Sequence, residues 1–422
     1  MALVEHSQHG ATAMSGNCRH CGAVFERSLC DLGLSPLANS YVAAEELGKK
    51  EPFYPLHAFV CPDCFLVQLQ EFESPEHIFS DYLYFSSYSS SWLKHAEQYV
   101  EQVSQRFGLG PQHSVVEVAS NDGYLLQYFK ARGVPVFGIE PAANVAEVAR
   151  AKGIPSLSEF FGTALATRLR AEGKPADLLL GNNVLAHVPD LNDFVRGLQT
   201  LLAPTGLITL EFPHLLRLMQ QNQFDTIYHE HFSYFSLLTI ERVFKAHGLR
   251  VFDVEQLATH GGSLRIYATH LQGSPHAEGP RVEALRQEEA AAGLANLDTY
   301  SAFEKQVQKT KRNLLRFLID AKEQGKSVAA YGAPAKGNTL LNYCGVKTDL
   351  IDYTVDLSPH KQGRYLPGTR IPIHAPSRIA ETKPDYLLVL PWNLRTEISA
   401  QMSQIRDWGG RFVFPIPTLE VD

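Results

Sequence analysis

Two short cysteine motifs constrain the fold of this chain more than any other feature. Cys18 and Cys21 form one C-x-x-C pair, and Cys61 and Cys64 form a second, in a chain of 422 residues with only six cysteines. Each pair can present two thiolates to one ion, and two pairs complete the tetrahedral four-sulfur site that zinc prefers. Because four sulfurs leave no open coordination position, we expect a structural Zn²⁺ ion. Four free thiols or two redox pairs are the alternatives.

The length and composition indicate a globular chain of about three domains. Hydrophobic residues make up 45% of the sequence and charged residues 20%, which is typical of a soluble protein. The net charge of −7 argues against a nucleic-acid partner, and no apolar run reaches the roughly 18 residues of a membrane span. Since the N-terminus lacks the pattern of a secretory signal, a cytoplasmic location is expected. The oligomeric state, monomer or dimer, stays open.

Three regions differ in their pattern. Residues 1–80 combine cysteines, prolines and short strand-like runs, and we expect them to form a small zinc-binding domain. In residues 81–270, apolar runs alternate with helical patterns, as in the βαβ units of a parallel sheet. Residues 271–422 begin with a charged helical stretch and then resume this alternation. The predicted fold class is α/β, with an N-terminal zinc-binding domain, a central Rossmann-like domain and a smaller Rossmann-like C-terminal domain.

The apolar run at 115–118 leads into a turn that is typical of a cofactor site. Glu117 lies near the end of this run, and small residues that allow close backbone approach build the turn. Glu140 ends the next apolar run, where an acid can hold two ribose hydroxyls. The candidate cofactor residues of these two turns are Glu117, Ala119, Ser120, Asn121, Asp122, Gly123, Glu140 and Pro141.

Three details favour S-adenosylmethionine (SAM) over NAD as the cofactor. Ala119 and Asn121 stand where two glycines of G-x-G-x-x-G would be, so no pyrophosphate cradle is evident. The stretch 158–161 offers an acid and aromatic rings suited to adenine. A fourth strand region, 177–181, runs into polar residues at its carboxyl end, where ligands bind in such sheets. Phe160, Phe161, Asn182 and Asn183 therefore join the candidate cofactor residues. The alternatives are an NAD-dependent nucleotide-sugar oxidoreductase and a non-catalytic scaffold with a SAM-type fold.

A histidine-rich segment at 228–236 indicates acid–base chemistry. Its H-E-H order does not match the H-E-x-x-H metal helix, so a second metal site is disfavoured. Histidine can take and return a proton at neutral pH, as the formation of a carbon nucleophile requires. His187 follows the fourth strand and can supply a donor to an enolate oxygen. Arg265 lies in another polar loop, where it binds substrate or forms a structural ion pair. A hydrogen-bonded core loop is the alternative for the histidine segment.

A second turn of this kind follows the strand-like run at 327–331. Lys336 and the backbone amides of the turn can hold phosphate, and Arg364 can do the same. Solvated charges are the alternative for both side chains. No acid follows at the expected distance, so we expect this domain to shape the substrate cleft rather than bind a second cofactor.

Together these motifs resemble the sugar C-methyltransferases of deoxysugar pathways, which methylate dTDP-4-keto-6-deoxysugars, usually at C3. The resemblance covers nearly the whole chain. It implies a SAM-dependent C-methyltransferase of deoxysugar and antibiotic biosynthesis, with a dTDP-linked nucleotide sugar bound between its domains. The matching stretches are 18–21, 37–40, 61–64, 82–89, 117–123, 182–187, 228–236, 260–265 and 331–338.

The resemblance also implies roles for particular residues. His231 would be the base that removes a proton next to the ketone, assisted by Tyr228 and Glu230. His187 would lie near the sugar carbonyl, and Tyr82 would be a second acid–base candidate. The expected substrate-binding residues are Asn39, Tyr84, Tyr88, His229, Arg265, Lys336, Asn338 and Arg364.

Overall fold

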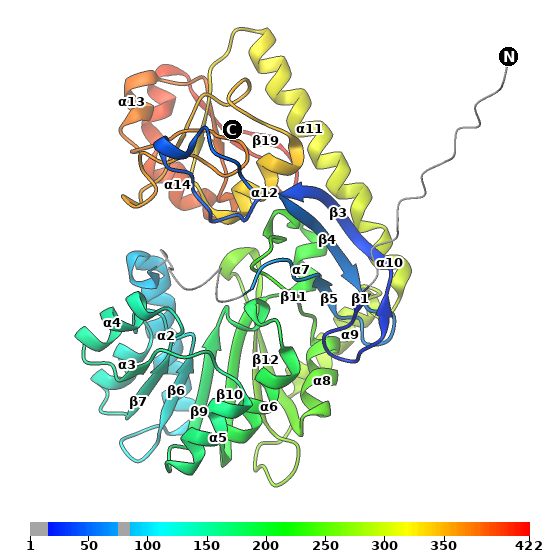
Figure 1. The fold of residues 1–422 in the computed structure, drawn as a ribbon, viewed down its shortest axis with the longest axis vertical. Helices are drawn as coiled ribbons and strands as arrows, with labels where there is room; N and C mark the ends of the chain where they lie inside the picture. The colour runs from blue at the N-terminus through cyan, green and yellow to red at the C-terminus, as the bar shows by residue number, and fades with distance from the viewer. Residues whose placement is uncertain (1–15, 75–84) are drawn as a thin grey trace, which may run out of the picture.

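The computed structural model describes residues 16–74 and 85–422, which form four β-sheets. Figure 1 shows the largest sheet below the C-terminal sheet, with the strands of the N-terminal region along one side of both. The predicted α/β class is confirmed. Among the described helices, none combines the length and the apolar character that crossing a bilayer requires.

The N-terminal region forms two small antiparallel sheets. Strands β1 (Gly16–Asn17) and β2 (Val24–Phe25) flank the first cysteine pair. Strands β3 (Arg27–Ser35), β4 (Tyr54–Val60) and β5 (Val67–Leu69) form the second sheet, and its fourth strand is β11 (Ser233–Tyr234). A strand from the histidine-rich segment therefore completes a sheet built by the N-terminal region.

The central sheet has seven strands in the order β12-β13-β10-β9-β6-β7-β8. The neighbouring strands β10, β9, β6, β7 and β8 run parallel to one another. Strand β13 is antiparallel to both of its neighbours, β10 and β12. The chain moves outward from β6 to β8 and then returns to β9 on the other side of β6. The carboxyl ends of β6 and β9 therefore form a topological switch point, where α/β sheets bind their ligands. The strands are β6 (Val115–Val118), β7 (Val136–Ile139), β8 (Ser156–Leu157), β9 (Ala176–Asn182), β10 (Leu202–Pro213), β12 (Leu249–Leu257) and β13 (Ser263–His270).

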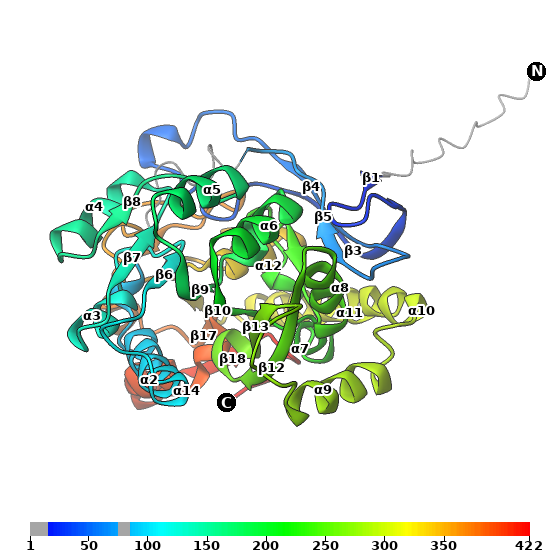
Figure 2. The same cartoon turned by 90° about the horizontal axis from the view of Figure 1, so that it is seen from below.

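Helices cover both faces of this sheet (Figure 2). In β9 the side chains of Leu178 and Leu180 pack on one face and that of Leu179 on the other, as the two-residue period of a strand requires. The first face is covered by α2 (Ser90–Phe107), α3 (Leu126–Ala131) and α4 (Ala143–Ala151). The second is covered by α5 (Thr163–Ala171), α6 (Leu191–Leu201) and α8 (Leu237–Ala246).

The C-terminal sheet has six strands in the order β16-β15-β14-β17-β18-β19, all parallel except β19. They are β14 (Val328–Tyr331), β15 (Thr354–Val355), β16 (Ile373–His374), β17 (Tyr386–Val389), β18 (Arg411–Phe414) and β19 (Glu420–Val421). The helices of this part are α11 (Phe303–Glu323), α12 (Ala335–Cys344), α13 (Arg378–Thr382) and α14 (Arg395–Gln401). One buried apolar cluster joins β3–β5 to α11 and this sheet.

Other contacts also cross the predicted boundaries. His214 directly precedes the short helix α7 (Leu215–Gln220). Its Nε2 lies 2.8 Å from the carboxylate of Glu289 in α9 (Pro280–Ala291). The same carboxylate accepts the backbone N–H of Leu237 and Leu238 at the start of α8. A further short helix, α10 (Leu297–Ser301), connects α9 to α11. The division into 1–80, 81–270 and 271–422 stays a prediction.

Candidate active site

The four predicted zinc ligands lie together in two turns of the same geometry. In each turn the first cysteine accepts a backbone N–H from the residue four positions later, Gly22 or Phe65, and both of these residues have positive φ. Cys18 Sγ lies 3.5 Å from Cys64 Sγ, Cys21 Sγ lies 3.5 Å from Cys61 Sγ, and all four sulfurs lie within 4.8 Å of one another. A tetrahedral zinc with Zn–S bonds of about 2.3 Å needs S–S separations of about 3.8 Å. The sulfur positions therefore fit a structural zinc ion.

The remaining two cysteines have a different environment. Burial raises the pKa of the Cys30 thiol and raises that of Cys344 to about 12. Both thiols therefore stay protonated at neutral pH and behave as small apolar side chains.

The turn after β6 is held in a conformation that few residues adopt. Ala119 and Asn121 have φ of 56° and 48°, and Gly123 has φ of 75°. A Cβ atom on Gly123 would also lie 3.0 Å from Ile154, in the connection between α4 and β8. Strained backbone of this kind persists where the surroundings fix it, and it is concentrated at ligand sites.

Glu140 fixes this turn to the end of β7. Its carboxylate accepts the backbone N–H of Asn121 and of Ala142, both at 2.9 Å. Pro141 lies half-buried between these two contacts. The predicted ribose acid is thus anchored beside the predicted cofactor turn, at the carboxyl edge of the sheet.

Glu117 is the most unusual group at this edge. It is fully buried, and among the described residues neither of its carboxylate oxygens has a hydrogen-bond partner. Burial raises its pKa well above the ordinary value, the charges of Glu140 and Asp122 raise it further, and the nearby Tyr124 hydroxyl opposes this shift. Buried Ser120 Oγ and Asp122 Oδ1 also have no partner in this part of the chain. Unpaired buried acceptors are costly, so the cluster fits SAM, whose amino and ribose hydroxyl groups are donors.

The other predicted cofactor residues border this edge in different ways. Phe161 packs edge-on against Phe194 with ring centroids 5.3 Å apart, whereas Phe160 is 45% exposed. The amide of Asn182 donates to Tyr124, and the amide of Asn183 donates to His260 Nε2 at 3.2 Å.

The histidine-rich segment brings two imidazole rings together above the same edge. The ring centroids of His187 and His231 are 4.7 Å apart. His231 Nδ1 lies 2.9 Å from the carbonyl of Thr226, and its Nε2 lies 2.8 Å from the hydroxyl of Tyr228. His187 Nδ1 lies 2.8 Å from the carbonyl of Glu230. Because a carbonyl only accepts, Nδ1 carries the proton in both rings and Nε2 carries the lone pair.

This protonation state bears on the predicted roles. Burial lowers the pKa of His231 well below its ordinary value, and the nearby His187 lowers it further. Burial lowers the pKa of His187 to about 4. Both rings are therefore neutral at pH 7, which suits a base. The Nε2 of neutral His187 accepts hydrogen bonds, so this arrangement differs from the donor role that the sequence suggested for it.

The N-terminal region supplies a direct partner to this segment. The amide of Asn39 donates to both carboxylate oxygens of Glu230, at 2.9 and 2.7 Å. Burial raises the pKa of Glu230 to about 7. The predicted substrate residue Asn39 and the predicted catalytic residue Glu230 are thus brought together.

The remaining predicted substrate residues are dispersed. Tyr82 and Tyr84 lie outside the described residues, and Tyr88 is 73% exposed. His229 contacts the carbonyl of Pro55 in β4, and Asn338 donates to the carbonyl of Ala38. These two side chains connect the N-terminal region to its neighbours. Arg364 is half-buried between β15 and β16.

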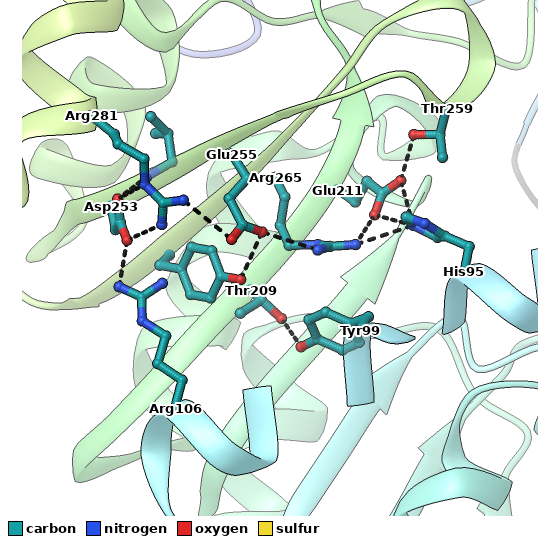
Figure 3. A network of polar contacts seen from close by, with 12 residues as sticks. His95, Tyr99, Arg106, Thr209, Glu211, Asp253, Glu255, Thr259, Arg265 and Arg281 are labelled. Carbon is teal, nitrogen blue, oxygen red and sulfur yellow. Dashed lines mark hydrogen bonds and ion pairs between the residues drawn. The ribbon is translucent and has the colours of Figure 1, made fainter. Parts of the chain in front are cut away.

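Arg265 belongs to a buried ion-pair network rather than to an open surface (Figure 3). Its guanidinium lies 2.7 Å from Glu211 and 3.1 Å from Glu255. Glu211 also contacts His95 of α2 at 2.9 Å and accepts a hydrogen bond from Thr259. The structure therefore supports the structural ion-pair alternative for Arg265. Sequence reasoning missed His95 and Glu211, although Glu211 near the end of a strand resembles Glu117 in its placement.

A cluster around Lys336 faces the histidines from the C-terminal region. Lys336 Nζ lies 2.8 Å from Asn393 Oδ1 and 4.6 Å from the centroid of the Trp392 ring, and Trp392 donates to Asp225 at 2.7 Å. Burial lowers the pKa of Lys336 and raises that of Asp225 to about 6. The charge of Lys336 also lowers the pKa of His231, which indicates their proximity. The sequence carried no signal for Asp225, because it is a single acid in the polar stretch 220–226 and belongs to no recognisable motif.

The expectation that no acid follows the second turn is wrong. Asp356 comes directly after β15, and its carboxylate accepts the backbone N–H of Ala333 at 2.8 Å. The carbonyl of Ala333 accepts Tyr41 Oη–H and Lys361 Nζ–H. Both the N–H and the carbonyl of Ala333 are therefore hydrogen-bonded to side chains of the protein, so the Ala333 amide does not point to a free phosphate site.

Comparison with known proteins gives matches along most of the chain. Family models match at residues 18–79 ("Putative zinc binding domain"), 92–254 ("Methyltransferase domain") and 258–417 ("C-methyltransferase C-terminal domain"). The C-methyltransferase NovU of Streptomyces niveus is 37% identical over 400 residues, which is 95% of each chain.

Two further similarities are partial. The ubiquinone biosynthesis O-methyltransferase of Bartonella tribocorum is 28% identical over 95 residues, 22% of this chain and 38% of that protein. The crystal structure of PH0226 protein from Pyrococcus horikoshii covers 47% of this chain and 99% of its own, with 14% identity and a TM-score of 0.37.

We expect the purified protein to contain one zinc ion per chain, measured by elemental analysis. Replacement of the exposed ligand, Cys21→Ser, should lower the zinc content and the melting temperature, because three sulfurs hold the ion less tightly. The control Cys344→Ala should keep its zinc. A folded wild-type protein without zinc would contradict the assignment.

Glu230→Gln should change stability in a pH-dependent way. Below the ordinary pKa of 4.5 both the folded and the unfolded protein hold the Glu230 proton, so the carboxyl group carries no penalty. Between pH 4.5 and about 7 only the unfolded chain ionises, which lowers the stability of the wild type. The variant's stability relative to the wild type should therefore be roughly 3 kcal/mol more favourable at pH 8 than at pH 4. Guanidinium unfolding at both pH values measures this, and a pH-independent difference would contradict it.

Proposed function

The chain belongs to the sugar C-methyltransferase family, and we propose that it methylates the carbon next to the ketone of a dTDP-linked 4-keto-6-deoxysugar. It is a SAM-dependent C-methyltransferase with a zinc-binding N-terminal domain. The proposal adds the substrate class, C3 as the preferred position and the role of His231 as the base. The single observation that carries the last point is the fixed orientation of the His231 ring.

Two contacts prepare His231 Nε2 to accept a proton. The Thr226 carbonyl holds the Nδ1 proton, so the lone pair of the neutral ring lies on Nε2. The Tyr228 hydroxyl is hydrogen-bonded to Nε2. When the C–H bond of a substrate approaches Nε2 instead, this hydroxyl can donate to a substrate oxygen. The lowered pKa keeps the ring in its basic form throughout the neutral range. A C–H bond next to a ketone is only weakly acidic, so its deprotonation by such a base requires that the site stabilise the resulting enolate.

The groups around the histidines can stabilise that negative charge. Lys336 brings positive charge to within electrostatic reach of His231 and His260. Tyr228 offers a hydroxyl donor, and Glu230 is about half protonated near pH 7. Such donors act strongly because the surroundings of His231 and Glu230 are buried. An anionic enolate or a diphosphate suits the charge of Lys336.

The cofactor cluster lies at the same edge of the sheet. When SAM is bound it supplies an electrophilic methyl group. Glu117 and Glu140 would hold its donor groups, because Glu117 is buried with neither oxygen hydrogen-bonded to a residue that the structure describes, and Glu140 is anchored to the neighbouring turn. The carbonyl of Ala186, which follows β9 of the same sheet, accepts the Phe232 N–H at 2.7 Å and so joins the two histidine segments. Proximity of a fixed base and a fixed methyl donor supports the proposed reaction.

Deuterium exchange tests the base without requiring methyl transfer. We expect the protein, incubated in D₂O with S-adenosylhomocysteine and dTDP-4-keto-6-deoxyglucose, to exchange one proton next to the ketone. The exchange rate of the His231→Asn variant should fall by at least about 100-fold, because Asn cannot accept the proton. Proton NMR of the sugar measures the rate, and the exchanged position shows whether C3 or C5 is activated.

His270→Asn is a matched control, because His270 lies in β13 and contacts the carbonyl of Leu202 away from the histidine pair. It should exchange like the wild type. Rapid exchange by His231→Asn would exclude His231 as the base. No exchange by the wild type, measured against an enzyme-free sample, would count against this class of keto-sugar.

A further inference from the structure

Arg19 lies inside the first zinc turn, between Cys18 and Cys21, and its side chain contacts residues outside that turn. Its Nη1 donates to the carbonyl of Pro189 at 2.9 Å, and its Nη2 donates to the carbonyl of Leu69 at 2.5 Å. One guanidinium thus joins two segments that are far apart in the sequence. Arginine suits this task because its planar fork presents several donors in fixed directions.

The Leu69 contact leads to His231. Leu69 ends β5, which follows the second zinc turn and pairs with β11 within the histidine-rich segment. The backbone N–H of Leu69 donates to the carbonyl of Phe232, the neighbour of His231, at 3.0 Å. The guanidinium of Arg19 also lies 5.5 Å from the centroid of the Phe232 ring. Arg19 therefore contacts both β5, which pairs with the segment that contains His231, and the ring of Phe232, which directly follows His231.

The Pro189 contact leads to His187. Pro189 lies two residues after His187, just beyond the short 3₁₀ helix Leu185–His187. The carbonyl of Ala186 in that helix accepts the N–H of Phe232, and His187 itself donates to the carbonyl of Glu230. The two histidine segments are therefore hydrogen-bonded to each other, and each is also tied to Arg19.

The backbone around Arg19 is fixed as firmly as its side chain. Its N–H donates to the side chain of Gln68 in β5 at 3.0 Å. The Asn192 amide in α6 donates to the carbonyls of Arg19 and His20 at 3.1 and 2.8 Å. The first zinc turn is thus hydrogen-bonded both to β5 and to α6 of the central domain.

We propose that Arg19 is a positioning residue that couples the zinc turn to the His187–His231 pair. The inference rests on the proposed role of these histidines. Loss of its two carbonyl contacts frees the backbone on both sides of the pair while the four sulfurs stay in place. The zinc site then serves catalysis by holding Arg19 as well as by stabilising the fold.

The Arg19→Gln variant tests this coupling, with dTDP-4-keto-6-deoxyglucose and SAM as substrates. We expect kcat to fall about 10- to 100-fold, because small displacements of reacting groups cost that much. The KM for SAM should stay within about twofold, and the zinc content should remain that of the wild type. In NMR spectra of protein with ¹⁵N-labelled histidine, the Nδ1–H signals of His187 and His231 should shift or broaden. Replacement of each histidine assigns these signals.

Arg242→Gln is the matched control. Arg242 also contacts a zinc turn, through the carbonyl of Asp63 and the ring of Phe65, and neither of these contacts involves the segments of His187 or His231. It should keep both kcat and the histidine signals. Arg19→Lys keeps the charge without the fork, and it should lie between wild type and Arg19→Gln, so it provides the test if Arg19→Gln does not fold.

The outcomes separate this inference from the proposed function. Unchanged kcat and unchanged histidine signals in zinc-loaded Arg19→Gln would overturn the coupling. Equal losses in the Arg19 and Arg242 variants would also overturn it, because they would indicate a general effect of the zinc turns. If the wild type methylates no keto-sugar, the proposed function fails, and the NMR comparison alone still decides whether Arg19 positions the two rings.

Discussion

The pairing of β5 with β11 is the contact on which the arrangement of this protein depends. It adds a strand that lies next to His231 to a sheet that begins at the zinc turns. Through the carbonyl of Ala186 the same segment is bound to the region after β9, at the switch point of the central sheet. The pairing of these two short strands therefore connects the zinc turns to the histidine-rich segment and to the edge of the central sheet. The apolar cluster that includes β3–β5 connects the same strands to the C-terminal region.

Burial of ionisable groups is the second property of this region. Burial raises the pKa values of Glu117 and Glu230 and lowers those of His231 and Lys336, so it favours the neutral form of each group. Such groups lower the stability of a fold, and their concentration in one place is typical of functional sites. In a methyltransferase that forms an enolate, neutral bases and weakly solvated donors are useful, because water would otherwise compete for the proton and the charge. The Arg265–Glu211–Glu255 network differs, since its opposite charges compensate one another.

Local spacing was enough to predict some features and not others. The zinc site followed from the two cysteine pairs, and the central sheet followed from alternating apolar runs, because both depend on neighbours in the sequence. The ion pairs of Arg265, the Asn39–Glu230 contact and the role of Asp225 depend on residues from distant segments, which no local pattern reveals. The Nδ1 tautomer of His187 depends on one backbone carbonyl, so the sequence could not distinguish a donor from an acceptor. The contact of Asp356 with the backbone of Ala333 likewise joins two distant segments of the chain.

The most direct test of the account is the fate of a labelled methyl group. The protein would be incubated with SAM carrying a ¹³C-methyl group and with dTDP-4-keto-6-deoxyglucose, and the product examined by carbon–proton correlation NMR. The proposed reaction places the ¹³C-methyl group on a ring carbon next to the ketone. A methyl group on a hydroxyl oxygen, or methylation of a substrate that has no acidic C–H bond, would contradict the central claim.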